Sequence, residues 1–243
     1  MIALGLLGFT IVMWVSVTFV RRRHPGAFRR IDAYAHLNRS VGLAVENGTR
    51  LHISLGRGSL FTTRGASSLA GLAMVRQLTE RTSLSDQPPV VTSGNAPLAI
   101  LSQDTLQSGY RAASAEEQYR FSTGRLTGLT PFSYAAGTIP IMQDEEVSAN
   151  VFIGDFGAES ALLADAAERE NSILIAASDN LAAQSVFYAT SQEPLVAEEL
   201  YAAGAYVGAG AAHDASLTVQ DILRWLIIAA IIVGSLLKFV GVI

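Results

Sequence analysis

Residues 150–177 read NVFIGDFGAESALLADAAERENSILIAA. The apolar runs at 150–154 and 172–177 are predicted strands, and residues 159–170 between them carry apolar side chains at helical spacing. Nearly continuous apolar strands that alternate with amphipathic helices are typical of a parallel sheet covered on both faces. This stretch therefore predicts an α/β fold.

The same strand-turn-helix unit is predicted earlier in the chain. A helix with an apolar stripe is expected from Asp32, as its N-cap, to a stop at Asn47-Gly48, and another begins at about Asn180. The remaining pairs of a strand and the helix that follows it are 51–55 with 65–80, and 89–92 with 97–113. Together these units predict a Rossmann-like, mostly parallel sheet with helices on both faces.

Three stretches fit this pattern less well. Residues 115–128 are polar and are predicted as a loop or as the site of a short strand at 119–122. Residues 132–146 look helical, but Pro140 is expected to kink or end that helix. Residues 194–206 are predicted as the last helix of the domain.

Both ends of the chain are apolar enough to cross a membrane. Residues 1–20 carry no charge and would be about 30 Å long as a helix, which matches the hydrocarbon thickness of a bilayer. The second apolar run covers residues 222–243, and its Lys238 lies close enough to the far end to snorkel. A cleaved signal peptide fits the first run poorly, because no basic residue precedes it and Arg21-Arg22-Arg23 follows it. The predicted organisation is a span at 1–20, a basic segment at 21–30, an α/β domain at 31–207, a linker at 208–221 and a span at 222–243.

Basic residues beside the spans predict the orientation. The positive-inside rule places the middle domain in the cytoplasm of a prokaryotic cell, at the plasma membrane, with both termini outside. The same residues are placed to contact anionic lipid head groups, whereas scattered arginines without interleaved aromatic residues argue against nucleic-acid binding. The residues of this membrane-surface group are Arg21, Arg22, Arg23, Arg29 and Arg30.

A candidate ligand site follows from the predicted fold, because ligands of parallel α/β sheets bind at the carboxyl ends of the strands. An arginine between two glycines can meet a phosphate or carboxylate, and Asp155 can hold a ribose hydroxyl. The alternative is structural, since Ser, Asn and Asp also cap helices and Gly also forms turns. The candidate residues are Gly56, Arg57, Gly58, Ser59, Ser93, Asn95, Asp155, Glu159, Ser178 and Asp179.

Several kinds of chemistry are disfavoured by the residues present. The only lysine is Lys238, so a Walker A lysine and a Schiff-base lysine are excluded from the middle domain. The chain has no cysteine, its four histidines have no ligand spacing, and Phe61 stands where a dinucleotide fingerprint needs glycine. Residues 144–146 are interpreted as a solvated helix end rather than a metal cluster. No cofactor or metal is expected, and a catalytic triad built on His52 remains a minor alternative.

Charge is distributed unevenly along the chain. Residues 1–125 hold 14 arginines and 7 acidic residues, whereas residues 126–243 hold 3 basic and 14 acidic residues. The two halves can neutralise each other within one fold, or the basic face of one copy can meet the acidic face of the next in a ring or array. Ala230 and Gly234 form a small-xxx-small pair that suits close packing of membrane helices.

Three stretches of the chain resemble an uncharacterised prokaryotic family of membrane proteins. These stretches are Ile31 to Gly58, Gly154 to Ser160 and Glu198 to Tyr206. That family is classed as a domain of unknown function, with an α/β domain between two terminal anchors. The resemblance implies no activity and no catalytic residue.

Two hypotheses about function remain. The first is a membrane-anchored scaffold that assembles with copies of itself on the cytoplasmic face. The second is a membrane-tethered domain or enzyme that binds a nucleotide or an anionic metabolite at the carboxyl ends of its strands. The absence of lysine, cysteine and paired histidine chemistry favours the scaffold.

Overall fold

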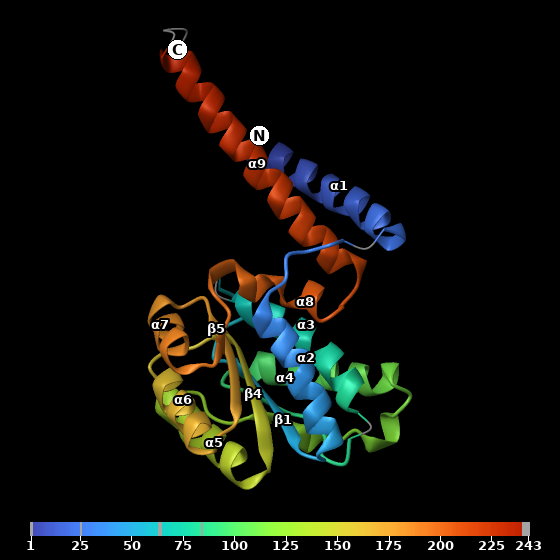
Figure 1. Ribbon diagram of the computed structural model, residues 1–243, viewed down its shortest axis with the longest axis vertical. Coiled ribbons are helices and arrows are strands. Elements are labelled where there is room, and N and C mark those ends of the chain that lie inside the picture. Colours follow the sequence, from blue (N-terminus) through green and yellow to red (C-terminus); the bar gives the residue numbers. More distant parts are fainter. Residues whose placement is uncertain (1, 25, 63–64, 84, 240–243) are drawn as a thin grey trace. The chain divides into compact units, whose positions relative to one another are not determined.

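The computed structural model describes residues 2–24, 26–62, 65–83 and 85–239. The chain forms two units (Figure 1), one made of residues 1–28 with 209–243 and the other of residues 29–208. The first residue and the last four residues of the predicted spans lie outside the described part.

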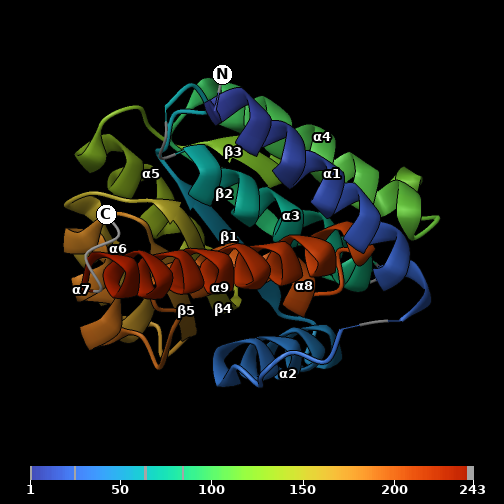
Figure 2. The same ribbon diagram turned by 90° about the horizontal axis from the view of Figure 1, so that it is seen from above.

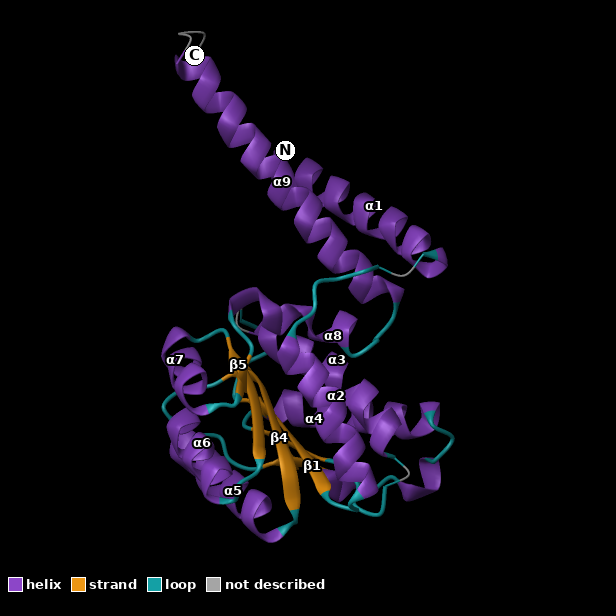
Figure 3. Ribbon diagram, in the orientation of Figure 1, coloured by secondary structure: helices purple, strands orange, loops and turns teal. Residues whose placement is uncertain are grey.

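The unit at 29–208 is built on one six-stranded sheet (Figure 3). All neighbouring strands are parallel, and their order across the sheet is β3-β2-β1-β4-β5-β6. This is the order of a doubly wound Rossmann sheet, so the predicted fold is confirmed. The strands are β1 Arg50–Gly56, β2 Val90–Ser93, β3 Gly124–Leu126, β4 Val147–Asp155, β5 Ile173–Ser178 and β6 Glu193–Pro194.

Helices cover both faces of this sheet. The helices α2, α3 and α4 lie on one face, where α3 and α4 run side by side (Figure 2), and α5, α6 and α7 lie on the other. These six helices are α2 Asp32–Glu46, α3 Gly65–Thr82, α4 Ala96–Ala112, α5 Pro131–Asp144, α6 Glu159–Arg169 and α7 Leu181–Thr190. The shorter helices are η1 Glu116–Gln118, η2 Phe121–Thr123, η3 Ala197–Ala202 and α8 Ala203–Tyr206.

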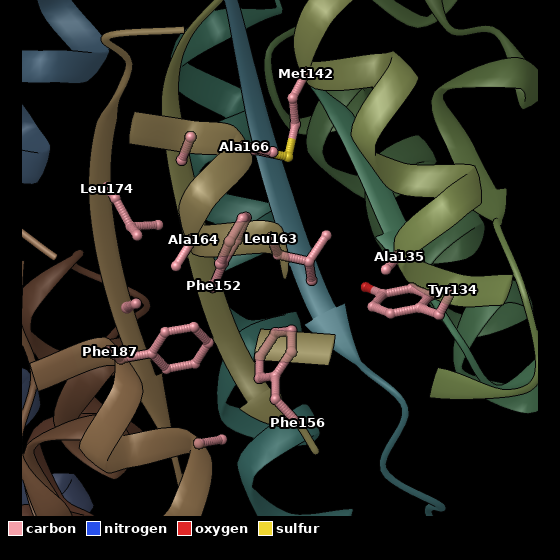
Figure 4. Packing of buried hydrophobic residues seen from close by; sticks show 13 residues of the cluster. Tyr134, Ala135, Met142, Phe152, Phe156, Leu163, Ala164, Ala166, Leu174 and Phe187 are labelled. Atoms are coloured by element: carbon pink, nitrogen blue, oxygen red, sulfur yellow. The ribbon is translucent and has the colours of Figure 1, made fainter. Parts of the chain in front are cut away.

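A cluster of aromatic and small side chains fills the space between the sheet and α5, α6 and α7 (Figure 4). Phe152 of β4 lies 5.9 Å from Phe156 and 6.0 Å from Phe187 of α7, measured between ring centroids. Phe156 and Phe187 meet edge to face at 5.3 Å. All three rings are fully buried, so they fix α6 and α7 against the centre of the sheet.

Three predicted elements were wrong in detail. Pro140 does not end α5, because buried residues on both sides of it, Tyr134 and Met142 among them, hold the helix against the sheet. The stretch 115–128 was expected to be a loop or to hold a strand at 119–122; its strand lies at 124–126, where the buried Gly124 lets the chain approach Gln103 closely. The last helix is replaced by an edge strand, a 3-10 helix and one short α-helix.

The other unit contains two long helices, α1 Ile2–Arg23 and α9 Ala211–Phe239. Both are long and apolar enough to cross a membrane. The Trp14 indole donates to the Ala212 carbonyl at 3.1 Å, and Arg21 donates twice to the Thr218 hydroxyl at 3.1 and 2.8 Å. Helix α9 already begins at Ala211, so it occupies most of the segment predicted as a linker.

The small-residue pair of α9 does not lie in the contact with α1. Ala230 is exposed, and a Cβ added to Gly234 would have nothing within 4 Å. The buried residues of α9 are Ala215 and Val219, nearer its start. Within one chain, the two helices therefore pack without Ala230 and Gly234.

Candidate functional site

The switch point of the sheet lies between β1 and β4, whose following helices leave toward opposite faces. Gly56 at the end of β1 stands opposite Asp155 at the end of β4. The Arg57 amide donates to the Asp155 carbonyl at 2.8 Å, and the Gly94 amide donates to the Gly56 carbonyl at 2.8 Å. These backbone groups at the ends of β1 and β4 therefore pair with each other and with the loop after β2.

Glycine is required at position 56. Its φ is +68°, and an added Cβ would lie 2.3 Å from the Asp155 carbonyl oxygen. This turn therefore brings the end of β1 into close contact with the end of β4.

The Arg57 side chain is already paired within the chain. Its Nε donates to Glu159 Oε1 at 2.9 Å, and its Nη1 donates to the Leu129 carbonyl at 3.1 Å. Its aliphatic part covers Gly94, where an added Cβ would lie 2.3 Å from Arg57 Cγ. Arg57 therefore joins the loops that follow β1, β2 and β3 to the start of α6.

Glu159 is the buried partner in this pair. Its side chain is completely buried at the first turn of α6, a position where the helix dipole favours a negative charge. The second carboxylate oxygen, Oε2, has no hydrogen-bond partner among the described residues. This open polar atom is a hydrogen-bond acceptor.

Three of the six other candidate residues accept hydrogen bonds from backbone amides. Asn95 caps α4 by accepting from the Leu98 amide at 3.3 Å, and Ser178 Oγ accepts from the Phe156 amide at 3.2 Å. Ser59 Oγ accepts from the Phe61 amide at 3.4 Å. Asn95 thus caps α4, whereas Ser59 and Ser178 accept hydrogen bonds from amides of the loops.

The remaining candidates do not converge on one site. Ser93 and Gly58 are buried, and Ser93 Oγ has no partner in the described part of the chain. Asp179 is exposed at the end of β5, two strands away from Gly56. The structure brings together Gly56, Arg57, Asp155 and Glu159.

His52 lies at the centre of the sheet in a chain of side-chain hydrogen bonds. Asn150 donates its amide to Ser172 at 2.7 Å, so its oxygen accepts from His52 Nδ1, also at 2.7 Å. His52 Nε2 then accepts from the Thr92 hydroxyl at 2.9 Å. Burial lowers the pKa of His52 to about 4. Because neither partner is a carboxylate, the triad considered from the sequence is not formed.

The acidic run at the end of α5 is only partly solvated. Asp144 and Glu146 are exposed, but Glu145 accepts from Arg50 Nη1 at 2.7 Å and from Arg125 Nη1 at 2.5 Å. The expectation of a solvated helix end was therefore wrong for Glu145, because β1 and β3 bring two arginines to it. No group of three or more metal-ligating side chains is found among the described residues.

Ion pairs link the basic first half of the chain to its acidic second half. They join Arg29 to Glu199, Arg50 and Arg125 to Glu145, and Arg57 to Glu159. These arginines thus neutralise acidic residues inside the same fold.

Large apolar side chains are exposed in the loops and helix starts that follow three of the strands at the carboxyl edge. We call Phe61, Leu129, Phe132 and Leu181 the edge patch; their exposed fractions are 88, 64, 71 and 81%. They follow β1, β3 and β5. Sequence periodicity could not find them, because isolated apolar residues in loops belong to no periodic pattern.

A Rossmann-ordered α/β domain between two helices able to span a membrane defines the class of this protein. The chain belongs to the family Domain of unknown function (DUF6754), whose model matches residues 1–243. This confirms the resemblance to a family of unknown function. No curated protein and no solved structure matches the chain.

Proposed function

We propose that this protein is a membrane-anchored scaffold that assembles with copies of itself through the edge patch. The observation that carries the proposal is the exposure of four large apolar side chains at one edge of the sheet. Large apolar side chains exposed on a folded domain mark a candidate interaction site. Full burial of one such side chain contributes about 1.5–3 kcal/mol.

A second copy is the occupant that we propose for the edge patch. Copies held in one membrane plane meet at a high effective concentration, so a small interface is sufficient. Repetition of the same contact produces a closed ring when the rotation closes and an array when it does not. The exposed pair Ala230 and Gly234 of α9 supplies a second surface where helices of neighbouring copies can pack.

Fewer arginines are available for contacts between copies than the uneven charge of the sequence suggested. Arg50, Arg57 and Arg125 pair with acidic residues of their own chain, so they are not free to meet a neighbour. We therefore expect assembly to depend on apolar contact rather than on ion pairs. High salt should then leave the oligomer intact.

We also propose a cytoplasmic position for residues 29–208, at the plasma membrane of a prokaryote, with both termini outside. Three arginines stand in the last turn of α1, on the side of residues 29–208, which supports this orientation by the positive-inside rule. Anionic head groups are the lipid partners that Arg22 and Arg23 would meet. Protease added to intact cells should leave the domain whole, and its degradation would contradict this orientation.

The alternative function, binding of a nucleotide or anionic metabolite at the carboxyl edge, has less support. Arg57 carries the only positive charge placed at the switch point in the described structure, and Glu159 neutralises it. The charge of Arg57 is thus already compensated within the chain. We therefore prefer the scaffold.

Native mass spectrometry of the full chain in mild detergent tests the scaffold. The double variant Phe61→Ser, Phe132→Ser should shift the wild-type oligomer toward monomer. Phe121→Ser is the matched control, because Phe121 is as exposed as Phe132, at 71%, but precedes β3 at the opposite edge. A wild-type monomer at every protein concentration, or an oligomer that survives the double substitution, would refute assembly through the edge patch.

A further inference from the structure

A cavity of about 690 Å³ lies at the amino edge of the sheet, opposite the edge where the sequence predicted a ligand. It is lined by residues at or just before the amino ends of β1, β2, β3 and β4, including Arg50, Arg125 and Glu145. The end of α4 adds Tyr110. Its volume lies within the range of small-molecule sites, about 300–1,000 Å³.

Three polar groups that line this cavity are buried without a hydrogen-bond partner in the described residues. They are the Tyr110 hydroxyl, Arg50 Nε and the Ser85 hydroxyl. The whole Tyr110 residue is 0% exposed. A buried polar group left unpaired costs about 1–3 kcal/mol, so three of them around one cavity indicate a place where a ligand completes the hydrogen bonds.

All three open groups can donate a hydrogen bond. Burial raises the pKa of Tyr110 to about 12, although the nearby charges of Arg50 and Arg120 lower it. The phenol therefore stays protonated at neutral pH. Arg120, which also lines the cavity, makes no ion pair within the described part of the chain. Donors and a free guanidinium around one phenol are suited to an anionic group.

Carboxylates surround these donors and limit which anions fit. Glu145 is held by Arg50 and Arg125, but four other acidic residues line the cavity and are exposed. They are Asp86, Glu117, Asp144 and Glu146. Three arginines thus face five carboxylates, so a polyanion such as a nucleotide would be repelled. A ligand with one anionic and one cationic group matches both parts of the lining.

We propose that this cavity binds a small zwitterion of the amino-acid class. Its carboxylate accepts hydrogen bonds from Tyr110, Arg50 and Ser85 and pairs with Arg120. Its ammonium group faces the exposed carboxylates at the mouth. This ligand site is separate from the edge patch, which lies at the other end of the strands.

Isothermal titration calorimetry on the full chain in detergent tests this proposal, with the twenty standard amino acids as probes. At least one of them should bind, and its N-acetyl derivative, which lacks the ammonium group, should bind at least tenfold more weakly. Tyr110→Phe removes only an unpaired hydroxyl and Arg120→Gln only an exposed charge, so both variants should fold. Each should weaken binding at least tenfold.

Matched controls separate the cavity from its surroundings. Tyr119→Phe removes a hydroxyl that donates to the Gln103 carbonyl, and Arg111→Gln removes an exposed arginine paired with Glu116; neither residue lines the cavity. Both should leave binding unchanged. Absence of binding by all twenty amino acids, unchanged affinity in Tyr110→Phe and Arg120→Gln, or tighter binding of ATP or inorganic phosphate would each overturn the proposal.

Discussion

The arginines at the two edges of the sheet differ in how completely their donors are paired. At the carboxyl edge, Arg57 is paired with the buried Glu159, and backbone hydrogen bonds close the strand ends. At the amino edge, Arg50 also pairs with a glutamate, but its Nε and the neighbouring Tyr110 hydroxyl stay open beside a cavity. The arginine that the sequence singled out is thus paired within the chain, whereas the amino edge leaves the donors Arg50 Nε and Tyr110 Oη open beside a cavity.

The largest effect is expected at the carboxyl edge. Arg57→Ala would leave the Glu159 carboxylate buried without a counter-charge and should lower the free energy of unfolding by about 3–5 kcal/mol. Urea unfolding of the full chain in detergent, followed by circular dichroism, measures this loss. Adding Glu159→Gln to the same chain should recover a large part of it, because the buried charge is then absent.

Arg169→Ala is the matched control for Arg57→Ala. Arg169 pairs with Asp165 on the surface of α6, and such exposed pairs contribute less than about 1 kcal/mol. If Arg57→Ala were as mild as this control, the pair with Glu159 would not be structural and Arg57 would again be a candidate for ligand binding.

A second prediction concerns the buried His52, which lies at the centre of the sheet between the two edges, and the dependence of stability on pH. The pKa of His52 is about 4 in the folded chain and about 6.5 when unfolded. Between these values only the unfolded chain takes up the proton, so stability is complete above pH 6.5 and falls by about 3 kcal/mol as the pH drops to 4. Urea unfolding at several pH values measures this slope.

The variant His52→Gln isolates the contribution of this residue. It keeps a polar side chain at the centre of the sheet but removes the group that titrates. The part of the slope between pH 6.5 and 4 that is due to His52 should disappear. An equal slope in both proteins would mean that His52 is protonated in the folded state and that the chain of hydrogen bonds is arranged differently.

The smallest expected changes in unfolding free energy come from removing one tyrosine hydroxyl at each edge. The Tyr134 hydroxyl meets Ser54 Oγ at 2.6 Å, so Tyr134→Phe should cost about 1 kcal/mol of unfolding free energy. The Tyr110 hydroxyl has no partner in the described structure, so Tyr110→Phe should be neutral or slightly stabilising in ligand-free protein. Thermal unfolding of the two variants side by side measures the difference. Equal costs would show that Tyr110 already has a partner and would remove the contrast between the edges.

The sequence was sufficient to predict the fold because the strands are continuous apolar runs that need no partner to be recognised. Strands β1, β4 and β5 lie within two or three residues of their predicted ends. The short edge strands were missed because their residues carry no apolar run, and β3 forms only where Gly124 packs against α4. Elements that depend on contacts between distant residues leave no local pattern.

From the sequence, turn and capping residues could be placed at the carboxyl edge of the sheet, but the side-chain contacts between them could not be predicted. Glycine turns and capping residues were expected at the carboxyl ends, and they occur there. The pairing of Arg57 with Glu159 joins residues from separate strand-helix units, and spacing along the chain contains no information on such a contact. For the same reason, Tyr110 and Arg50 could not be recognised as neighbours from the sequence.

The edge strands of the sheet have a consequence for a protein crowded in a membrane. Strand β6 contains two residues, one of them Pro194, which has no amide hydrogen, and β3 contains three residues. A sheet with such short outer strands offers little backbone for another sheet to join. In the assembly that we propose, contacts between copies are therefore made by side chains and not by continuous β-structure.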